Sequence, residues 1–138
     1  MPRKIEMRAG INLEEMPAWK EAKTLTVAVY DLIHQGQLGR NLPLKEQLRE
    51  ASVTLMSRLA DALDAEALEP PDDALSIATR ATSEVQSCLH VARAMGYLSE
   101  EAFHALYDQV RRARASIAAL MKRLRMIEPA EPAVPSSV

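Results

Sequence analysis

The sequence has one cysteine, four glycines, and among its aromatic residues only one tryptophan, three tyrosines and one phenylalanine. The single cysteine, Cys88, excludes an internal disulfide and favours a reducing compartment. Four glycines supply few of the tight turns that hairpins need, which argues against an all-β fold. Because aromatic residues are scarce, Ala, Leu, Met and Val must fill the core, and such small side chains favour closely packed helices.

Membrane and secretion signals are also missing. No apolar run approaches the length of about eighteen residues that a membrane-spanning helix needs, and Met1–Glu6 is too polar for a signal peptide. The formal net charge of −2 gives no global attraction to nucleic acid or to anionic membranes. We therefore expect a cytoplasmic protein with no membrane partner.

The strongest positive feature is one apolar row near the C-terminal end. Its members are spaced alternately three and four residues apart, so they share one face of a helix: Phe103, Leu106, Val110, Ala113, Ile117, Leu120, Leu124 and Ile127. That helix would be roughly 37 Å long. An apolar row of this length must be covered by other helices.

Three earlier segments show the same periodicity. The first begins at Pro17 and ends near Gly36, and its inward positions are Trp19, Ala22, Leu25, Val29, Leu32 and Ile33. The breaks between segments carry typical helix-end residues: the loop 36–41 with Asn41 as an N-cap, Pro70-Pro71, Gly96 after the third segment, and Ser99 before the fourth.

Short connections make consecutive helices antiparallel neighbours. The sequence therefore predicts an all-α protein, an antiparallel up-down-up-down four-helix bundle over residues 13–127. Residues 1–12 are polar, and we expect a flexible N-terminal segment there. Residues 128–138 contain three prolines and predict a disordered Pro-rich tail.

Among catalytic sites, a metal site is the one that the sequence supports best. Bundles of this size can hold two metals between inward carboxylates and Glu-x-x-His pairs. Glu101 and His104 form one such pair, and Asp31 and His34 form a similar one. In an antiparallel bundle, His34, His90 and His104 would lie at the same end. The histidines lie near helix ends and outside the apolar rows, so ordinary solvated histidines are the stronger interpretation. A metal-dependent bundle enzyme stays as a remote alternative.

The sequence has no glycine-rich phosphate loop and no nucleophile elbow. We therefore predict a protein that is not an enzyme, with no catalytic residue, no cofactor and no metal. Cys88 lies in the apolar row of the third helix, where a small buried hydrophobe is the favoured interpretation. Glu84 lies one residue from that row, and a partly buried carboxylate needs a partner. We expect a structural clasp with Arg49 or Arg58 of the second helix.

Charge is segregated along the chain. Six cations follow one another without an acid between Gln109 and Ile127: Arg111, Arg112, Arg114, Lys122, Arg123 and Arg125. An acidic block without a base precedes the third helix: Asp61, Asp64, Glu66, Glu69, Asp72 and Asp73. The cations form either a solvated face near a helix C-terminus, or a binding surface for an anionic ligand such as RNA, or a contact with the acidic block of a neighbouring copy.

Two stretches resemble one known family. The first is Gln47-Leu48-Arg49-Glu50-Ala51-Ser52-Val53-Thr54-Leu55, which is similar to a Gln-hydrophobic-Arg-Arg-Ala-x-x-Ser-Ile motif. The second runs from Ala78 through Glu84, Leu89 and Ala92 to Gly96-Tyr97-Leu98. Both motifs are typical of bacterial four-helix bundle proteins encoded in intervening sequences of 23S ribosomal RNA genes and as accessory variability proteins of diversity-generating retroelements. Trp19 and Ala22 also fit the family's aromatic-x-x-Ala pattern.

The resemblance implies a homo-oligomeric ring, typically a pentamer, and a scaffold or adaptor role towards a protein or RNA partner. Retroelement members are strongly basic and bind nucleic acid, whereas this chain is mildly acidic. It also departs from the family at Glu50, at Arg58-Leu59-Ala60-Asp61-Ala62 and at Arg80-Ala81. Nucleic-acid binding through the basic face of the fourth helix is therefore the alternative function.

Overall fold

The computed structural model describes residues 12–64, 66 and 69–127, and the side chains as far as Arg125. This part of the chain forms helices and no β-strand, which confirms the all-α prediction. The elements are the 3-10 helix η1 (Leu13–Glu15) and the α-helices α2 (Pro17–Ile33), α3 (Gly36–Arg40), α4 (Leu42–Leu63), α5 (Pro71–Ala94) and α6 (Glu100–Ile127). The predicted flexible segment 1–12, except Asn12, and the predicted disordered tail 128–138 lie outside the described residues.

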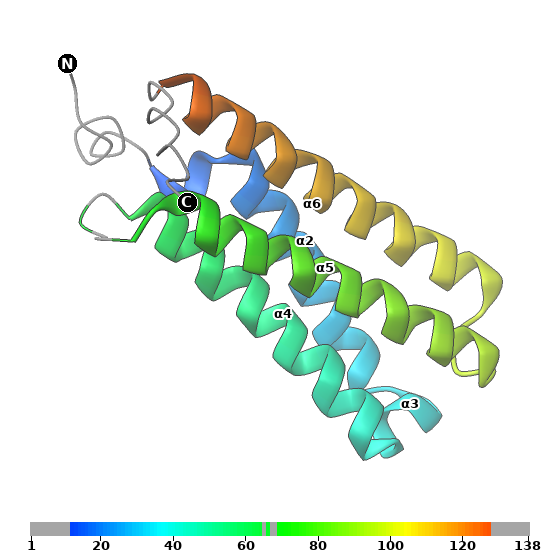
Figure 1. The fold of residues 1–138 in the computed structure, drawn as a ribbon. Helices are drawn as coiled ribbons and strands as arrows, with labels where there is room; N and C mark the ends of the chain where they lie inside the picture. Colours follow the sequence, from blue (N-terminus) through cyan, green and yellow to red (C-terminus); the bar gives the residue numbers. More distant parts are fainter. Residues whose placement is uncertain (1–11, 65, 67–68, 128–138) are drawn as a thin grey trace, which may run out of the picture.

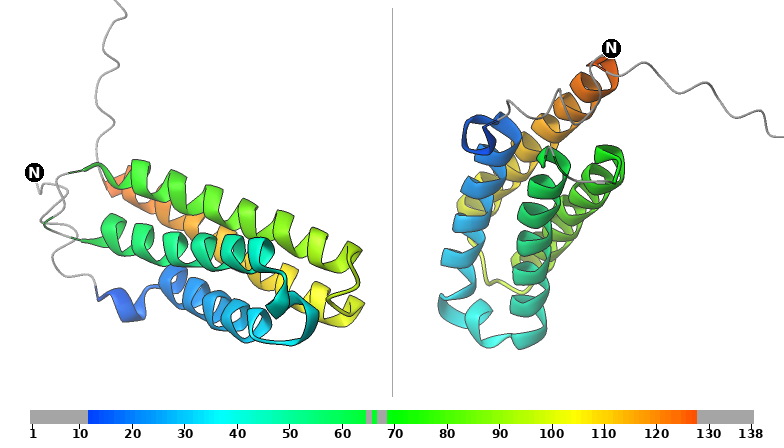
Figure 2. Two further views of the ribbon diagram at one scale, coloured as in Figure 1. Left: turned by 90° about the horizontal axis from the view of Figure 1, so that it is seen from below. Right: turned by 90° about the vertical axis from the view of Figure 1, so that its left-hand side faces the viewer.

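Four long helices lie side by side (Figure 1). α2 packs along α4 and α6, and α5 packs along the same two helices. Two further views show the same arrangement, with the short helix α3 joining α2 to α4 at one end (Figure 2). The molecule is thus a helical bundle with its core between the long helices. None of the described helices has the length and apolar character needed to cross a membrane.

The apolar row of α6 is the largest contributor to one side of the core. All seven of its members from Phe103 to Leu124 are buried, as the spacing predicts. Ile127, the eighth, lies beyond the described side chains. The other three long helices supply fully buried leucines to the same core: Leu25 from α2, Leu48, Leu55 and Leu59 from α4, and Leu75 and Leu89 from α5.

The predicted helix ends are confirmed by their hydrogen bonds. The side chains of Asn41 and Ser99 each accept a hydrogen bond from the backbone N–H three residues on, at 3.2 Å and 3.1 Å. Gly96 follows α5 with a φ of +76°, and the N–H of Tyr97 donates to the carbonyl of Ala92 at 2.8 Å. A side chain at residue 96 would be strained there, because L-residues rarely adopt this backbone conformation.

The segment 36–41 differs from the prediction, since most of it is the helix α3 rather than a loop. Gly36 begins this helix with a φ of +53°, and Leu38 is buried, which holds the turn against the core. Gly39 lies so close to the end of α2 that an added Cβ would be 3.0 Å from the carbonyl oxygen of Ile33. Two glycines in six residues hide this helix from a periodicity argument.

The inward face of α2 was also predicted only in part. Trp19 and Leu32 are partly exposed, and Ala18 is buried instead. The side of α2 that faces the core carries the small side chain of Ala18, and the larger indole of Trp19 lies at the edge of this buried face. The two buried polar residues of the described chain, Ser52 and Thr82, donate their hydroxyl protons to carbonyl oxygens of their own helices.

The core predicts a contrast between two valines. Val110→Ala removes a fully buried side chain and should lower the free energy of unfolding by about 2 to 3 kcal/mol. Val53 on α4 is half-exposed, and Val53→Ala should change the free energy of unfolding by less than about 1 kcal/mol. Urea denaturation followed by circular dichroism measures both values, and equal losses would contradict the position of the core.

Candidate interaction surfaces

The six predicted cations of α6 are all exposed. They divide into two groups by their contacts within the chain. Arg111 lies over the ring of Tyr107 on its own helix, and Arg114 and Arg125 bond to side chains of α5. Arg112, Lys122 and Arg123 have no ion pair in the part of the chain that the structure describes.

Two of the contacting arginines link α6 to α5. The Nη1 of Arg114 donates to the Oε1 of Gln86 at 3.1 Å, and the Nε of Arg125 lies 3.1 Å from the Oδ2 of Asp72. We call the six cations of α6 the basic row. Asp72 belongs to the acidic block, so one part of that block pairs with the basic row of the same chain. Both partners are well exposed, and such a pair contributes about 0–1 kcal/mol to stability. The basic row is therefore only partly available to a ligand.

Aromatic and cationic side chains gather where α5 ends and α6 begins. The rings of Phe103 and Tyr107 stack with centroids 5.4 Å apart. The guanidinium of Arg93 lies 4.5 Å from the Phe103 centroid, and that of Arg111 lies 5.0 Å from the Tyr107 centroid. His90 contacts both rings edge-on or tilted. This cluster fastens the two helices together, since cation–π contacts contribute about 0.5–1 kcal/mol each at exposed sites.

The three histidines do not converge on one centre. His34 bonds through Nδ1 to the carbonyl of Tyr30, His90 packs on Phe103, and His104 lies 3.5 Å from a carboxylate oxygen of Glu100. Within residues 12–64, 66 and 69–127, no three His, Cys, Asp or Glu side chains come together in a way that could hold a metal ion. The two sequence pairs, Glu101 with His104 on α6 and Asp31 with His34 on α2, therefore do not come together to form a metal site.

The expected clasp on Glu84 is not formed. Arg49 pairs with Glu46 and Arg58 pairs with Asp61, at 3.6 Å in the second case. Each arginine thus takes the acid three residues away on its own helix, which costs less side-chain entropy than reaching across to α5. Glu84 is only partly buried, so water still solvates its carboxylate.

Cys88 is buried, as predicted. It lines a small hollow of about 250 Å³ between α4 and α5, together with Gln47, Arg80, Ser83, Glu84 and Ser87. Burial raises the pKa of the Cys88 thiol above its ordinary value, and the negative charge of Glu84 raises that pKa further. A raised pKa keeps the thiol protonated, which is the opposite of what a nucleophilic cysteine needs.

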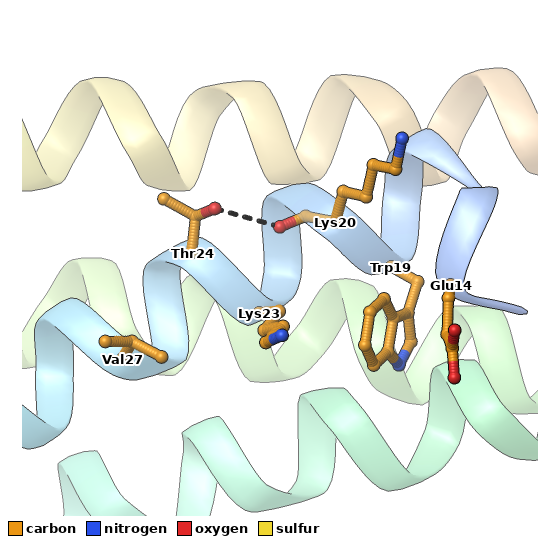
Figure 3. Close-up of a pocket in the computed structure, with 6 residues that line it drawn as sticks. All are labelled: Glu14, Trp19, Lys20, Lys23, Thr24 and Val27. Carbon is orange, nitrogen blue, oxygen red and sulfur yellow. Dashed lines mark hydrogen bonds between the residues drawn. The ribbon is translucent and has the colours of Figure 1, made fainter.

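A larger hollow, of about 700 Å³, lies on the outside of α2 (Figure 3). Trp19, the only tryptophan of the chain, extends from α2 towards α4, and the ammonium of Lys23 lies 5.4 Å from its ring centroid. Lys20 and Thr24 lie on the opposite side of α2, towards α6 (Figure 3). Glu14 of η1 closes one end, and Val27 lies at the other. We call this site the α2 hollow, and the site around Glu84 the α4–α5 hollow.

Sequence reasoning missed the α2 hollow because it assigned Trp19 to the core. The available signal was the four-residue spacing of Trp19, Lys23 and Val27, which places three different chemistries on one side of a helix. Apolar side chains also remain half-exposed elsewhere on the bundle: Leu42, Val53, Val91 and Met95.

Comparison with known proteins gives one match. A family model described as 23S rRNA-intervening sequence protein matches residues 14–121. The matched region runs from η1 into the last third of α6, so it includes both hollows and three of the six cations of α6. A search of curated proteins gives no match.

The contact between Glu84 and Cys88 predicts a titration result. Glu84→Gln removes a negative charge beside the thiol and should lower the pKa of Cys88, though not to its ordinary value, because burial is the larger cause. The thiolate absorbance of this single cysteine, followed against pH, measures the shift. Glu101→Gln on α6 is the control and should leave the titration unchanged. An unchanged or raised pKa in Glu84→Gln would contradict the geometry.

Proposed function

Since the chain belongs to the 23S rRNA-intervening sequence protein family, we propose that it is a non-enzymatic, homo-oligomeric scaffold or adaptor for a protein or RNA partner. In this proposal the subunit is an antiparallel up-down-up-down four-helix bundle, and copies assemble into a ring of five. The bundle topology is supported by the short connections 34–41 and 95–99, which allow each helix to pack beside its predecessor.

The observation that carries the oligomer is unused apolar surface. Val27, Leu42, Val53, Val91 and Met95 are each exposed by half or more, although the core would have had room only for smaller side chains at the bundle edge. The α2 hollow adds an indole that is only partly covered. Exposed apolar side chains beside a partly covered indole offer surface that a second protein can bury.

A role without catalysis is supported by the chemistry of the hollows. Catalysis needs acids, bases or nucleophiles with tuned pKa values in a water-excluded pocket. Here the charged side chains Lys23 and Glu84 line open hollows on helix surfaces, and the pKa of Cys88 is shifted away from reactivity. A cytoplasmic location belongs to the same proposal, because a lone buried thiol suits a reducing compartment.

Nucleic-acid binding is the second candidate, and the unpaired cations of α6 favour it. Arg112, Lys122 and Arg123 are exposed and have no ion pair in the described chain. They are free to neutralise phosphates of an RNA or DNA strand. The mild negative charge of the whole chain weakens long-range attraction, so binding would depend on this local group.

The oligomer predicts a mass. Sedimentation equilibrium at micromolar concentration should give about five times the mass of the 15.3 kDa chain, because a closed ring of the proposed kind contains five copies. A mass equal to one chain across the concentration range would rule out the scaffold.

The second candidate predicts a salt effect. If the cations bind phosphates, the affinity for a single-stranded RNA should fall steeply with salt. Lys122→Gln with Arg123→Gln should then reduce the slope of log affinity against log salt by about 1 to 2. The matched control, Arg40→Gln with Lys45→Gln, removes two cations from α3 and α4 and should leave the slope unchanged. Fluorescence anisotropy measures both, and no binding in low salt would remove this candidate.

A further inference from the structure

The two hollows contain charged side chains that form no ion pair within the described part of the chain. The α2 hollow carries Glu14, Lys20 and Lys23, and the α4–α5 hollow carries Arg80 and Glu84. Across the described residues, none of these five lies within 4 Å of an opposite charge. Each hollow thus presents both an acid and a base to whatever approaches it.

Glu84 has the greatest need of a partner. It is partly buried, and the two arginines that could have reached it across α4 are held by Glu46 and Asp61. Glu84 lies one turn before Cys88 on α5, and both side chains line the hollow. An incoming cation can therefore reach the Glu84 carboxylate from outside the bundle.

A half-exposed valine lines the α2 hollow, and another lies further along the helix that carries Glu84. Val27, which is 53% exposed, lies four residues after Lys23 on α2. Val91, which is 50% exposed, lies seven residues after Glu84, or two turns along the same side of α5. Ionic and apolar groups therefore lie next to one another on each surface, as they do at the edge and centre of a protein interface.

A base of the α2 hollow and the acid of the α4–α5 hollow each precede a valine on their helix. On α2, Lys23 lies four residues before Val27, and on α5, Glu84 lies seven residues before Val91. When α2 of one copy lies parallel to α5 of another with Lys23 opposite Glu84, the two valines fall on the same side of this ion pair. The opposite alignment would bring the valine of each helix towards the charges of the other.

We propose that the α2 hollow of one copy docks on the α4–α5 hollow of the next, with Lys23 paired to Glu84, with Val27 packed towards Val91, and with Trp19 covered on the Arg80 side of the pair. This rests on the proposed homo-oligomer and names its interface. The two surfaces differ, so the contact is heterologous and leaves one free hollow of each kind on a pair of copies. Repetition of such a contact closes a ring when the rotation between copies allows it.

Charge reversal tests the pairing. Glu84→Lys and Lys23→Glu should each raise the dissociation constant of the assembly at least about tenfold, because each leaves two like charges facing one another. The double variant restores opposite charges and should associate within about threefold of the wild-type chain. Sedimentation velocity over a dilution series measures all four proteins, and circular dichroism melting verifies that each is folded.

Matched controls reverse a charge of each sign elsewhere on the bundle. Asp108→Lys on α6 and Arg40→Glu on α3 alter exposed residues away from both hollows and should assemble as the wild-type chain does. If Glu84→Lys and Lys23→Glu also assemble normally, or if the double variant is not rescued, the interface is wrong while the proposed oligomer stands. That result would assign the hollows to another protein or to nucleic acid. If the wild-type chain is itself a monomer, the proposed function fails first.

Trp19 gives an independent measurement because it is the only tryptophan. Glu84→Lys changes α5 and leaves the α2 hollow of its own chain untouched. In the proposed interface this variant should nevertheless shift the Trp19 emission to longer wavelength, since the neighbouring copy no longer covers the indole. A Glu84→Lys protein that dissociates with unchanged emission would place Trp19 outside the interface and overturn the proposal.

Discussion

The covering of the apolar row on α6 is the constraint from which the other features follow. A row that runs from Phe103 to Leu124 along one helix needs neighbours of similar length. α2 and α5 provide them, and α4 closes the core on the far side. Alanines are frequent among the buried residues, so the long helices pack closely. Trp19 and several valines lie at the edges of the packed faces and stay partly exposed to solvent.

The distribution of charge follows from the same packing. Where α5 and α6 touch, arginines of α6 find acceptors on α5, as with Arg125 and Asp72. On α4 the arginines find acids one turn away on their own helix. Charges without an ion pair in the described chain include Lys23 on α2, Glu84 on α5 and Lys122 on α6. The intramolecular pairs strengthen the bundle a little, and the unpaired charges are the part of the surface from which specificity towards a partner can come.

Much of this fold could be read from local sequence patterns. The row on α6, the caps at Asn41 and Ser99, and the turn at Gly96 depend on periodicity and on the backbone needs of helix ends, which are local properties. The short helix α3 was missed because its stability comes from the burial of Leu38, a tertiary effect. The side-chain partners were harder still. Arg49 pairs with Glu46 three residues away rather than with Glu84 across the bundle, so the local spacing was the better guide.

The candidate surfaces show the same limit. The exposed cations of α6 were found because a charge run is visible in one dimension, whereas the two hollows combine residues from η1 and α2, or from α4 and α5. The charges of the hollows became candidates for binding only when the structure showed that they form no ion pair in the described chain. The family assignment, in contrast, needed only ordered motifs along the sequence.

Ser52 and Thr82 have a consequence for the inside of the bundle. Both hydroxyl groups are spent on carbonyls of their own helices, so neither one ties two helices together in the way that a directional polar bridge does. Inside the core the long helices are then aligned by interdigitating apolar side chains, whereas directional links between α5 and α6, from Arg114 to Gln86 and from Arg125 to Asp72, lie on the surface. Displacement of one long helix lengthwise along its neighbour would therefore have to disrupt the apolar packing and these surface links together.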